Sequence, residues 1–291
     1  MAKSVHSQLL KVLQQEDINF LLTNRIPRRL ATRWMGWFSR IESPALARAA
    51  IAVWRLFADL DLAESKKKSF GSLRDCFTRE LRAGARPLDG DPSMLISPCD
   101  GIVGACGTVR GTEPLQAKGF PYRLEDLLID PELVETYRDG TYVTLRLTSS
   151  MYHRFHAPHD ATVERVTYVS GDTWNVNPIA LRRVERLFCR NERAVLRLRL
   201  GAGSHPVALV PVAAILVAGI RLHFLDVVMN MNYRGAADIA CSTRVRRGDE
   251  LGWFEHGSTI IVFAPRGFRL CDGIGDGTKI QMGQRLMVLP C

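Results

Sequence analysis

The chain changes character near residue 95, and this change limits its fold more than any other feature of the sequence. Before it, apolar residues such as Leu30, Trp34 and Ile41 recur at roughly helical spacing within residues 29–62. After it, short apolar runs alternate with Gly, Pro and Asp, which is typical of strands and turns. The sequence therefore predicts an α+β protein in which basic, amphipathic N-terminal helices precede a β-rich body.

The run ESKKK at residues 64–68 marks the predicted boundary between two regions. Residues 1–68 are predicted to be a helical N-terminal region, and residues 69–291 a single β-rich domain. A further helix is expected at residues 72–83, because Gly84 and Pro87 follow it. In the β-rich domain we expect strands at residues 142–147, 161–169, 194–200, 207–220, 251–263 and 285–289, and helices at residues 124–128 and 178–187.

The N-terminal helices place arginines beside tryptophans, a pattern typical of helices that lie in a membrane interface. The alternative is that these helices pack on the core of the protein. A net charge of +9 favours an anionic partner, either a membrane face or a nucleic acid. No uninterrupted apolar window of about 18 residues is present, and the N-terminus lacks a signal-peptide pattern. We therefore expect peripheral attachment to an anionic membrane.

Three short segments carry residues suited to activating a hydroxyl group. They are SPCDG at residues 97–101, YHRFH at residues 152–156 and GST at residues 257–259. A serine hydroxyl becomes a good nucleophile when an imidazole takes its proton and a carboxylate orients that imidazole. Each segment alone is more often a turn, a loop or the start of a strand. Together they supply Asp100, His156 and Ser258 as candidate catalytic residues.

Longer blocks around these segments resemble the phosphatidylserine decarboxylase family. The blocks follow the family's order from about residue 29 to the C-terminus. They are FGSLRDCFTRELRAGARPLDGDP at residues 70–92, the SPxDG block, QAKGFPYRLEDLL at residues 116–128, YHRFHAP at residues 152–158, GDTWNVNP at residues 171–178, NERAV at residues 191–195, and GST with the later FAP at residues 263–265.

This resemblance implies a zymogen that cuts itself and then decarboxylates phosphatidylserine to phosphatidylethanolamine. Ser258 would attack the carbonyl carbon of Gly257, with His156 as the base and Asp100 orienting it. The cut would leave a β chain of residues 1–257 and an α chain of residues 258–291, whose first residue, Ser258, becomes a pyruvoyl cofactor. The pyruvoyl carbonyl would accept the electrons that carbon dioxide leaves behind. His153 is our candidate for the acid that then protonates the substrate, the alternative being that it only orders its loop.

The implied partners are phosphatidylserine, an anionic membrane surface, and the α and β chains of one precursor. No metal and no nucleic acid are expected, whereas a homo-oligomer is left open. The seven cysteines form no C-x-x-C pair and are read as reduced thiols, so we place the protein at the cytoplasmic face of the bacterial inner membrane. Lys118 is a candidate contact for the lipid phosphate.

One residue departs from the family's pattern, and three other readings remain. His256 stands where bacterial members usually carry Leu before the Gly-Ser-Thr, and on an extended chain it would share a face with Ser258 as a rival base. The first other reading is a serine hydrolase that uses Ser258, His156 and Asp100 without self-cleavage. A second is a metal site built from His153, His156 and His159. A third is a nucleic-acid-binding module that uses Arg182, Arg183, Arg186, Arg190 and Arg193.

Overall fold

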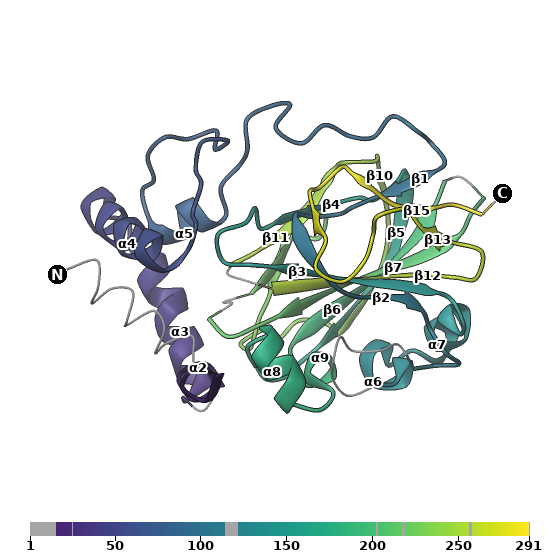
Figure 1. Cartoon of the computed structure of the whole chain (residues 1–291), viewed down its shortest axis with the longest axis horizontal. Helices are drawn as coiled ribbons and strands as arrows, with labels where there is room; N and C mark the ends of the chain where they lie inside the picture. The colour runs from purple at the N-terminus through teal and green to yellow at the C-terminus, as the bar shows by residue number, and fades with distance from the viewer. Residues whose placement is uncertain are drawn as a thin grey trace.

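The computed structural model describes residues 16–24, 26–113, 122–201, 203–216, 219–255 and 258–290. It confirms the α+β class, because helices at the start of the chain precede a body of antiparallel sheets, with further short helices between some of its strands. In Figure 1 the first helices stand beside a sheet-rich body, and a long segment runs over the top of the view from these helices into the body.

One antiparallel sheet of eight strands forms the core of the described body. Its central strand, β12 (Ser258–Ala264), is buried at every position. The uninterrupted apolar run TIIVFA suits a strand that is covered on both faces. The spatial order of the sheet is β10 (Asp238–Val245), β5 (Ala161–Val169), β6 (Arg193–Leu200), β7 (Pro206–Ala213), β12, β3 (Thr141–Leu147), β2 (Gly101–Thr108) and β14 (Lys279–Ile280).

Two smaller antiparallel sheets pack beside the large one. The first has the order β1 (Met94–Ile96), β15 (Arg285–Val288) and β13 (Arg269–Leu270). The second has the order β4 (Arg154–His156), β11 (Glu250–Phe254), β8 (Ile220–Leu222) and β9 (Val227–Met229). As a result, two apolar runs that were each predicted to be one strand are divided between two sheets.

Two predicted strands are therefore wrong in length. The expected strand at residues 251–263 is β11 in the four-stranded sheet followed by β12 in the eight-stranded sheet. The expected strand at residues 207–220 likewise ends as β7 at Ala213, and β8 begins at Ile220. Both runs are apolar throughout, and apolar patterning does not show where a buried chain leaves one sheet for another.

The N-terminal region contains α2 (Glu16–Asn24), α3 (Arg28–Ser39) and α4 (Pro44–Phe57). The helical region expected at residues 29–62 contains two helices, because Ser43 caps α4 and Pro44 begins it. In the body, α6 (Leu124–Leu128) has the predicted bounds, whereas residues 178–187 divide into α8 (Pro178–Arg183) and α9 (Leu187–Arg190). The helix α7 (Pro131–Tyr137) was not predicted.

The helix predicted at residues 72–83 is wrong beyond its first turns. The observed helix, α5 (Leu73–Phe77), is capped by Ser72 and ends before Thr78. The backbone then bonds elsewhere: the Lys66 amide donates to the Glu80 carbonyl, and the Arg82 amide donates to the Glu64 carbonyl. Pairing with the preceding linker keeps these residues extended, so tertiary contacts override their helix propensity.

Candidate functional site

Ser258 is the first residue of β12 and is fully buried between two neighbouring strands. Its partners across the sheet are Leu147 of β3 and Ala213 of β7. The Ser258 Oγ atom makes no hydrogen bond with any residue that the structure describes. A buried hydroxyl without a partner is costly and uncommon, which makes this oxygen a candidate reactive group. His256 and Gly257 lie outside the described residues.

The two hydrogen bonds of the His156 imidazole define its tautomer. Its Nδ1 lies 2.9 Å from the Gly248 carbonyl oxygen, and its Nε2 lies 3.0 Å from the Tyr152 hydroxyl. Since a carbonyl oxygen only accepts, Nδ1 carries the proton and Nε2 accepts the Tyr152 hydroxyl. Burial lowers the pKa of His156, although the Gly248 carbonyl and nearby carboxylates oppose that shift. The ring therefore presents a basic Nε2, which Tyr152 covers in this structure.

Asp100 lies beside this histidine segment but is bonded to an arginine. Its carboxylate accepts two hydrogen bonds from Arg86, at 2.8 and 2.6 Å, and one from the Met282 amide at 2.9 Å. No hydrogen bond joins Asp100 to His156 among the described residues; the two segments meet where the His156 amide donates to the Pro98 carbonyl at 2.8 Å. The Gly248 carbonyl thus holds the imidazole in the way we had expected of Asp100.

His153 is fully buried on the approach to β4 and contacts an aromatic ring. The ring centroids of His153 and Phe77 are 4.0 Å apart. The His153 carbonyl accepts a hydrogen bond from the Phe254 amide, which ties this segment to β11. His153 therefore packs against Phe77 of α5, on the side of the body that faces the N-terminal helices.

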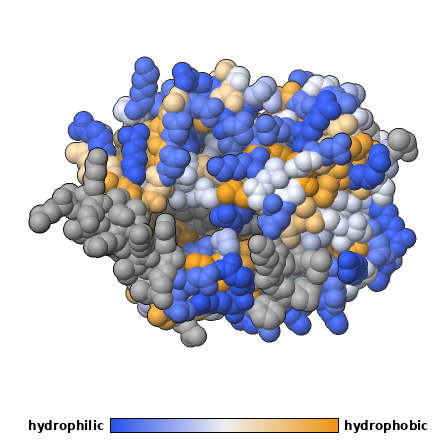
Figure 2. All heavy atoms as spheres, viewed as in Figure 1, coloured by the Kyte–Doolittle hydropathy of each residue, from blue (hydrophilic) through white to orange (hydrophobic). Residues whose placement is uncertain are grey.

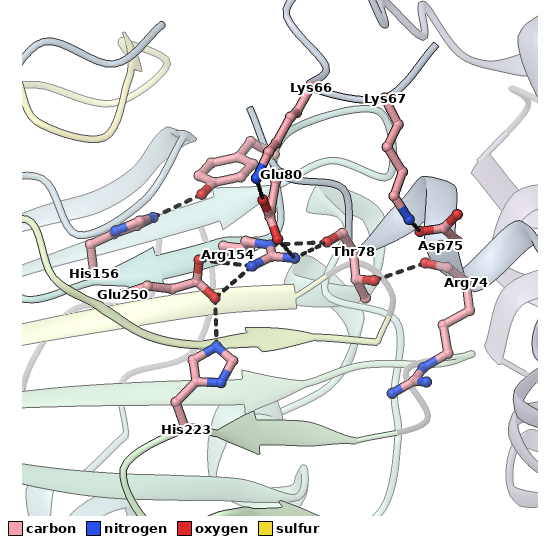
Figure 3. Close-up of polar contacts among 11 residues, drawn as sticks. Lys66, Lys67, Arg74, Asp75, Thr78, Glu80, Arg154, His156, His223 and Glu250 are labelled. Carbon is pink, nitrogen blue, oxygen red and sulfur yellow. Dashed lines mark hydrogen bonds and ion pairs between the residues drawn. The ribbon is translucent and has the colours of Figure 1, made fainter. Parts of the chain in front are cut away.

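Arg154, between the two histidines, fixes β4 against the segment that follows α5 (Figure 3). Its guanidinium donates to the Thr78 carbonyl at 2.9 and 2.8 Å and to Glu250 at 2.8 Å. Glu250 also contacts the His223 imidazole at 2.5 Å, and Figure 3 shows these groups meeting from different elements. This network fixes the backbone that carries His153 and His156.

An apolar cavity of about 690 Å³ lies between the N-terminal helices and the body. Figure 2 shows a hollow in this face, with apolar residues in its wall. Leu147, the β3 partner of Ser258, lines the cavity, and so does Ala214, which follows the β7 partner. The cavity thus opens at the same end of the sheet as Ser258. Its other walls come from Met35, Phe38, Ala50, Val53, Trp54, Leu73, Phe77, Arg146, Thr148, Ser149, Asn175, Val176, Asn177, Ile215 and Leu216.

Glu255 joins the N-terminal helices to the segment that leads into Ser258. It is buried, and its two oxygens form ion pairs of 2.6 Å with Arg40, after α3, and Arg74 of α5. No sequence pattern considered above singled out this residue. A single acid directly after the apolar LGWF at residues 251–254 was the available signal, because a buried carboxylate requires a cationic partner.

The outer face of the N-terminal helices is rich in exposed apolar side chains. Along α3, Thr32, Gly36 and Ser39 are buried, whereas Leu30, Trp34 and Trp37 are more than half exposed. In the described part of the chain, no helix has both the length and the apolar character needed to cross a bilayer. The large hydrophobic residues exposed on these helices are Leu21, Leu30, Trp34, Trp37, Val53, Leu56 and Phe57.

The histidines proposed as a metal site do not converge. His156 contacts Tyr152 and Gly248, while the two ring nitrogens of His159 face the carbonyl oxygens of Pro92 and Asp160. Within the described ranges, no group of three or more His, Cys, Asp or Glu side chains is arranged to hold a metal ion.

Most of the arginines considered for nucleic-acid binding have acidic partners. Arg182 pairs with Glu16, Arg183 with Glu16 and Asp17, and Arg186 with Asp126. Arg193 is buried, and its guanidinium donates to backbone carbonyls. Their charges are largely compensated, which weakens the case for a nucleic-acid surface.

Comparison with known proteins identifies one family. The family model described as phosphatidylserine decarboxylase matches residues 73–288. A phosphatidylserine decarboxylase proenzyme from Halorhodospira halophila is 38% identical over 272 residues, covering 90% of this chain and 90% of the relative. The proenzyme of the same name from Haemophilus influenzae is 33% identical over 274 residues, covering 90% and 92%. That from Erwinia tasmaniensis is 32% identical over 284 residues, covering 93% and 94%.

Proposed function

The chain belongs to the phosphatidylserine decarboxylase family, and on that premise we propose that it converts phosphatidylserine to phosphatidylethanolamine after cutting itself between Gly257 and Ser258. The observation that carries this proposal is the buried Ser258 Oγ. It is unpartnered among the described residues and lies at the end of the sheet where the apolar cavity opens. This arrangement supplies a nucleophile and, beside it, space for a lipid.

In the proposed cut, the Ser258 Oγ atom attacks the Gly257 carbonyl carbon, and the peptide bond becomes an ester. Elimination breaks the bond between Cβ and Oγ of Ser258 and releases the Gly257 carboxylate. Water then replaces the nitrogen of the resulting dehydroalanine, so that ammonia leaves and a pyruvoyl group remains. Gly257 suits this role, because it has no side chain to hinder the attack. When formed, the group supplies a conjugated carbonyl that accepts electrons as carbon dioxide leaves.

The neutral His156 is the proposed base for the Ser258 hydroxyl. Its Nδ1 proton is held by the Gly248 carbonyl, which leaves Nε2 as the atom that accepts a proton. The Tyr152 hydroxyl occupies Nε2 at 3.0 Å, so Tyr152 must yield or relay the proton during the cut. Asp100 contributes its charge to this environment and, through Arg86, fixes the segment that contacts the His156 amide.

His153 is the proposed acid for the decarboxylated substrate. It lies behind Phe77, whose ring lines the apolar cavity, so a modest movement of Phe77 would open a path between the imidazole and the cavity. His153→Ala should therefore still cut itself but turn over phosphatidylserine slowly. The fraction cut and the turnover rate are measured on one preparation. Loss of both would place His153 in the cutting step, and retention of both would remove it from the chemistry.

Attachment to an anionic membrane through the N-terminal helices is part of the same proposal. The exposed Trp34 and Trp37 lie on α3, and the cavity is walled by Met35 and Phe38 of that helix. A lipid could thus move from a bilayer into the cavity along one short element. Such interfacial attachment combines buried apolar area with attraction between basic residues and anionic lipids.

Intact-mass measurement of the purified protein tests the proposal. We expect two chains, residues 1–257 and residues 258–291, the smaller one lighter by one ammonia than plain hydrolysis would give. The same sample should release carbon dioxide from phosphatidylserine. A single uncut chain with full decarboxylase activity would contradict the proposed cofactor, and an uncut chain with esterase activity would favour a serine hydrolase.

A further inference from the structure

Arg146 stands out in the body as a partly buried cation without a counter-charge. It lies on β3, and its guanidinium forms no ion pair or hydrogen bond with the residues that the structure describes. Every Asp and Glu of the chain falls inside the described ranges, and none forms an ion pair with Arg146, although Asp276 lines the smaller of the two cavities that Arg146 borders. Burial lowers the pKa of the Arg146 guanidinium, and no neighbouring charge contributes to that shift. A desolvated cation of this kind is costly unless something compensates it.

The position of Arg146 ties it to the candidate active site. Arg146 is paired across the sheet with Thr259, and the next pair along the same two strands is Leu147 with Ser258. Side chains in successive pairs leave the backbone on opposite faces of the sheet. The Arg146 side chain therefore leaves β3 on the face opposite to that of Ser258. The large cavity opens at the ends of the strands, however, and both Arg146 and Leu147 line it. Arg146 thus lines the cavity, and its cross-strand pair with Thr259 is next to the pair that contains Ser258.

The surroundings of Arg146 suit one end of an amphiphile. The large cavity is walled mainly by apolar side chains, but Thr148, Ser149 and Asn175 lie in its lining near the strand ends. Arg146 also lines a second, smaller cavity of about 230 Å³ on the other face of the sheet. Thr259 lines that cavity, and its buried Oγ1 makes no hydrogen bond among the described residues. An arginine bordered by hydroxyl and amide groups is a common setting for an oxyanion.

We propose that Arg146 binds the phosphodiester of the lipid headgroup, placing the serine amine of that headgroup at position 258. This inference rests on the proposed function. An arginine fork matches phosphate oxygens with two parallel hydrogen bonds, which a lysine cannot do. The substrate carboxylate is the less suitable partner, because an ion pair with it would stabilise the charge that decarboxylation removes. Lys118, our sequence-based candidate for the phosphate contact, lies outside the described residues.

Binding of the product shows which of the two anions Arg146 contacts, because phosphatidylethanolamine keeps the phosphate and lacks the carboxylate. We would compare wild-type protein with Arg146→Gln in detergent micelles of fixed composition, measuring KM for phosphatidylserine and Ki for phosphatidylethanolamine. Both constants should rise tenfold to about a hundredfold, the range for hydrogen bonds to a charged group. Arg146→Lys should recover part of the loss. A rise in KM alone would assign the contact to the carboxylate and overturn the proposal, as would two unchanged constants.

Controls separate this proposal from the proposed function and from misfolding. Arg182→Gln removes a charge from the lining of the smaller cavity, but Arg182 already pairs with Glu16, so both constants should stay near wild type. The fraction cut is measured by intact mass for each variant. Uncut, inactive wild-type protein would refute the proposed function itself. If Arg146→Gln is not cut, inhibition of the wild type is compared between phosphatidic acid and diacylglycerol, and Arg146→Lys is assayed in the same way. Equal inhibition by the two lipids would exclude a phosphate site.

Discussion

The β-rich body and the N-terminal helices are built on opposite principles. In the body, β12 is buried at all its positions, and Ser258 is fixed by strands on both sides. Along α3 the pattern is inverted, since small and polar residues face the body and tryptophans face outward. Ion pairs join these helices to the body, among them Arg28 with Asp172 and Arg40 with Glu255. This difference supports the proposal that the body carries the chemistry and that the helices provide a surface for lipid.

Glu255 is where the two regions meet. It lies at the end of β11, immediately before the segment that crosses into β12, and its ion pairs reach back to Arg40 and Arg74. The helices are therefore joined to the cleavage segment by buried charge rather than by apolar packing alone. If the comparison holds, changes in the body should affect cutting strongly, and changes on the outer helix face should not affect it.

Removing the nucleophile should have the largest effect. Ser258→Ala should give a single uncut chain with decarboxylase activity at background, because both the attacking oxygen and the source of the cofactor are lost. Intact mass and carbon dioxide release measure the two results. Thr259→Ala, which removes the neighbouring buried hydroxyl, should still be cut. Normal cutting of Ser258→Ala would place the cut at another bond.

Asp100→Asn should reduce the rate of cutting by about a hundredfold or more, within the range for losing acid-base assistance. It should also lower the free energy of unfolding by roughly 3 kcal/mol, because a buried Arg86 loses its main partner. Thermal unfolding and a time course of cutting measure these effects. In the double variant Asp100→Asn/Arg86→Met, stability should recover while cutting stays slow. Recovery of both would reduce Asp100 to a structural partner of Arg86.

Glu255→Gln should slow cutting about tenfold, since the cleavage segment loses two ion pairs that position it. The time course of cutting measures this change. Asp172→Asn provides a matched control, because it releases α3 from the body at Arg28, away from the cut. Equal rates for Glu255→Gln and Asp172→Asn would show that general attachment of the helices, rather than the position of Glu255, matters.

The pH dependence of cutting should be shallow near neutrality. Because burial lowers the pKa of His156, the imidazole stays neutral below the ordinary histidine value of about 6.5. A base with a lowered pKa loses activity only at a correspondingly lower pH. We expect freshly synthesised precursor to be cut at rates within about twofold between pH 8 and pH 6.5, and more slowly in more acidic buffer. A rate that is already falling above pH 7 would point to a different base, and His256→Ala would then be tested.

The outer face of α3 should matter least for cutting and most for membrane binding. The double variant Trp34→Ser/Trp37→Ser should be cut at the wild-type rate, while its affinity for anionic vesicles falls about tenfold or more, because two exposed apolar anchors are lost. Vesicle sedimentation at several salt concentrations measures the affinity. Ile129→Ser, an exposed apolar residue of the body, should bind vesicles normally. Equal losses in both proteins would reject the assignment of the helices as the membrane face.

The sequence predicted elements well where an apolar run is bounded by turn residues. The strand β5 and the helix α6 have the expected bounds, and each is flanked by polar or turn-forming residues. It failed where the outcome depends on distant contacts. Residues 78–83 are not helical, because their backbone bonds to the linker and to Arg154 instead. The run at residues 251–263 passes from one sheet to another without any change in composition.

The same distinction holds for the candidate site. Ser258, His156 and Asp100 were found from residue types, and their roles stay predictions. The hydrogen-bond partners that define their chemistry lie far along the chain, since Gly248 is 92 residues from His156 and Arg86 is 14 from Asp100. A glycine that acts through its carbonyl oxygen, or one arginine among many, has no distinguishing pattern in a single sequence.

The place of β12 between β3 and β7 has a thermodynamic consequence for the cut protein. Cutting before Ser258 would turn an internal strand into the start of a separate chain, held by hydrogen bonds and packing on both sides. Unfolding would then release two molecules, so its midpoint would depend on protein concentration. Reassembly would also lose the high effective concentration that the uncut chain provides. The mature enzyme would thus owe its persistence to slow unfolding, having folded once as a single chain.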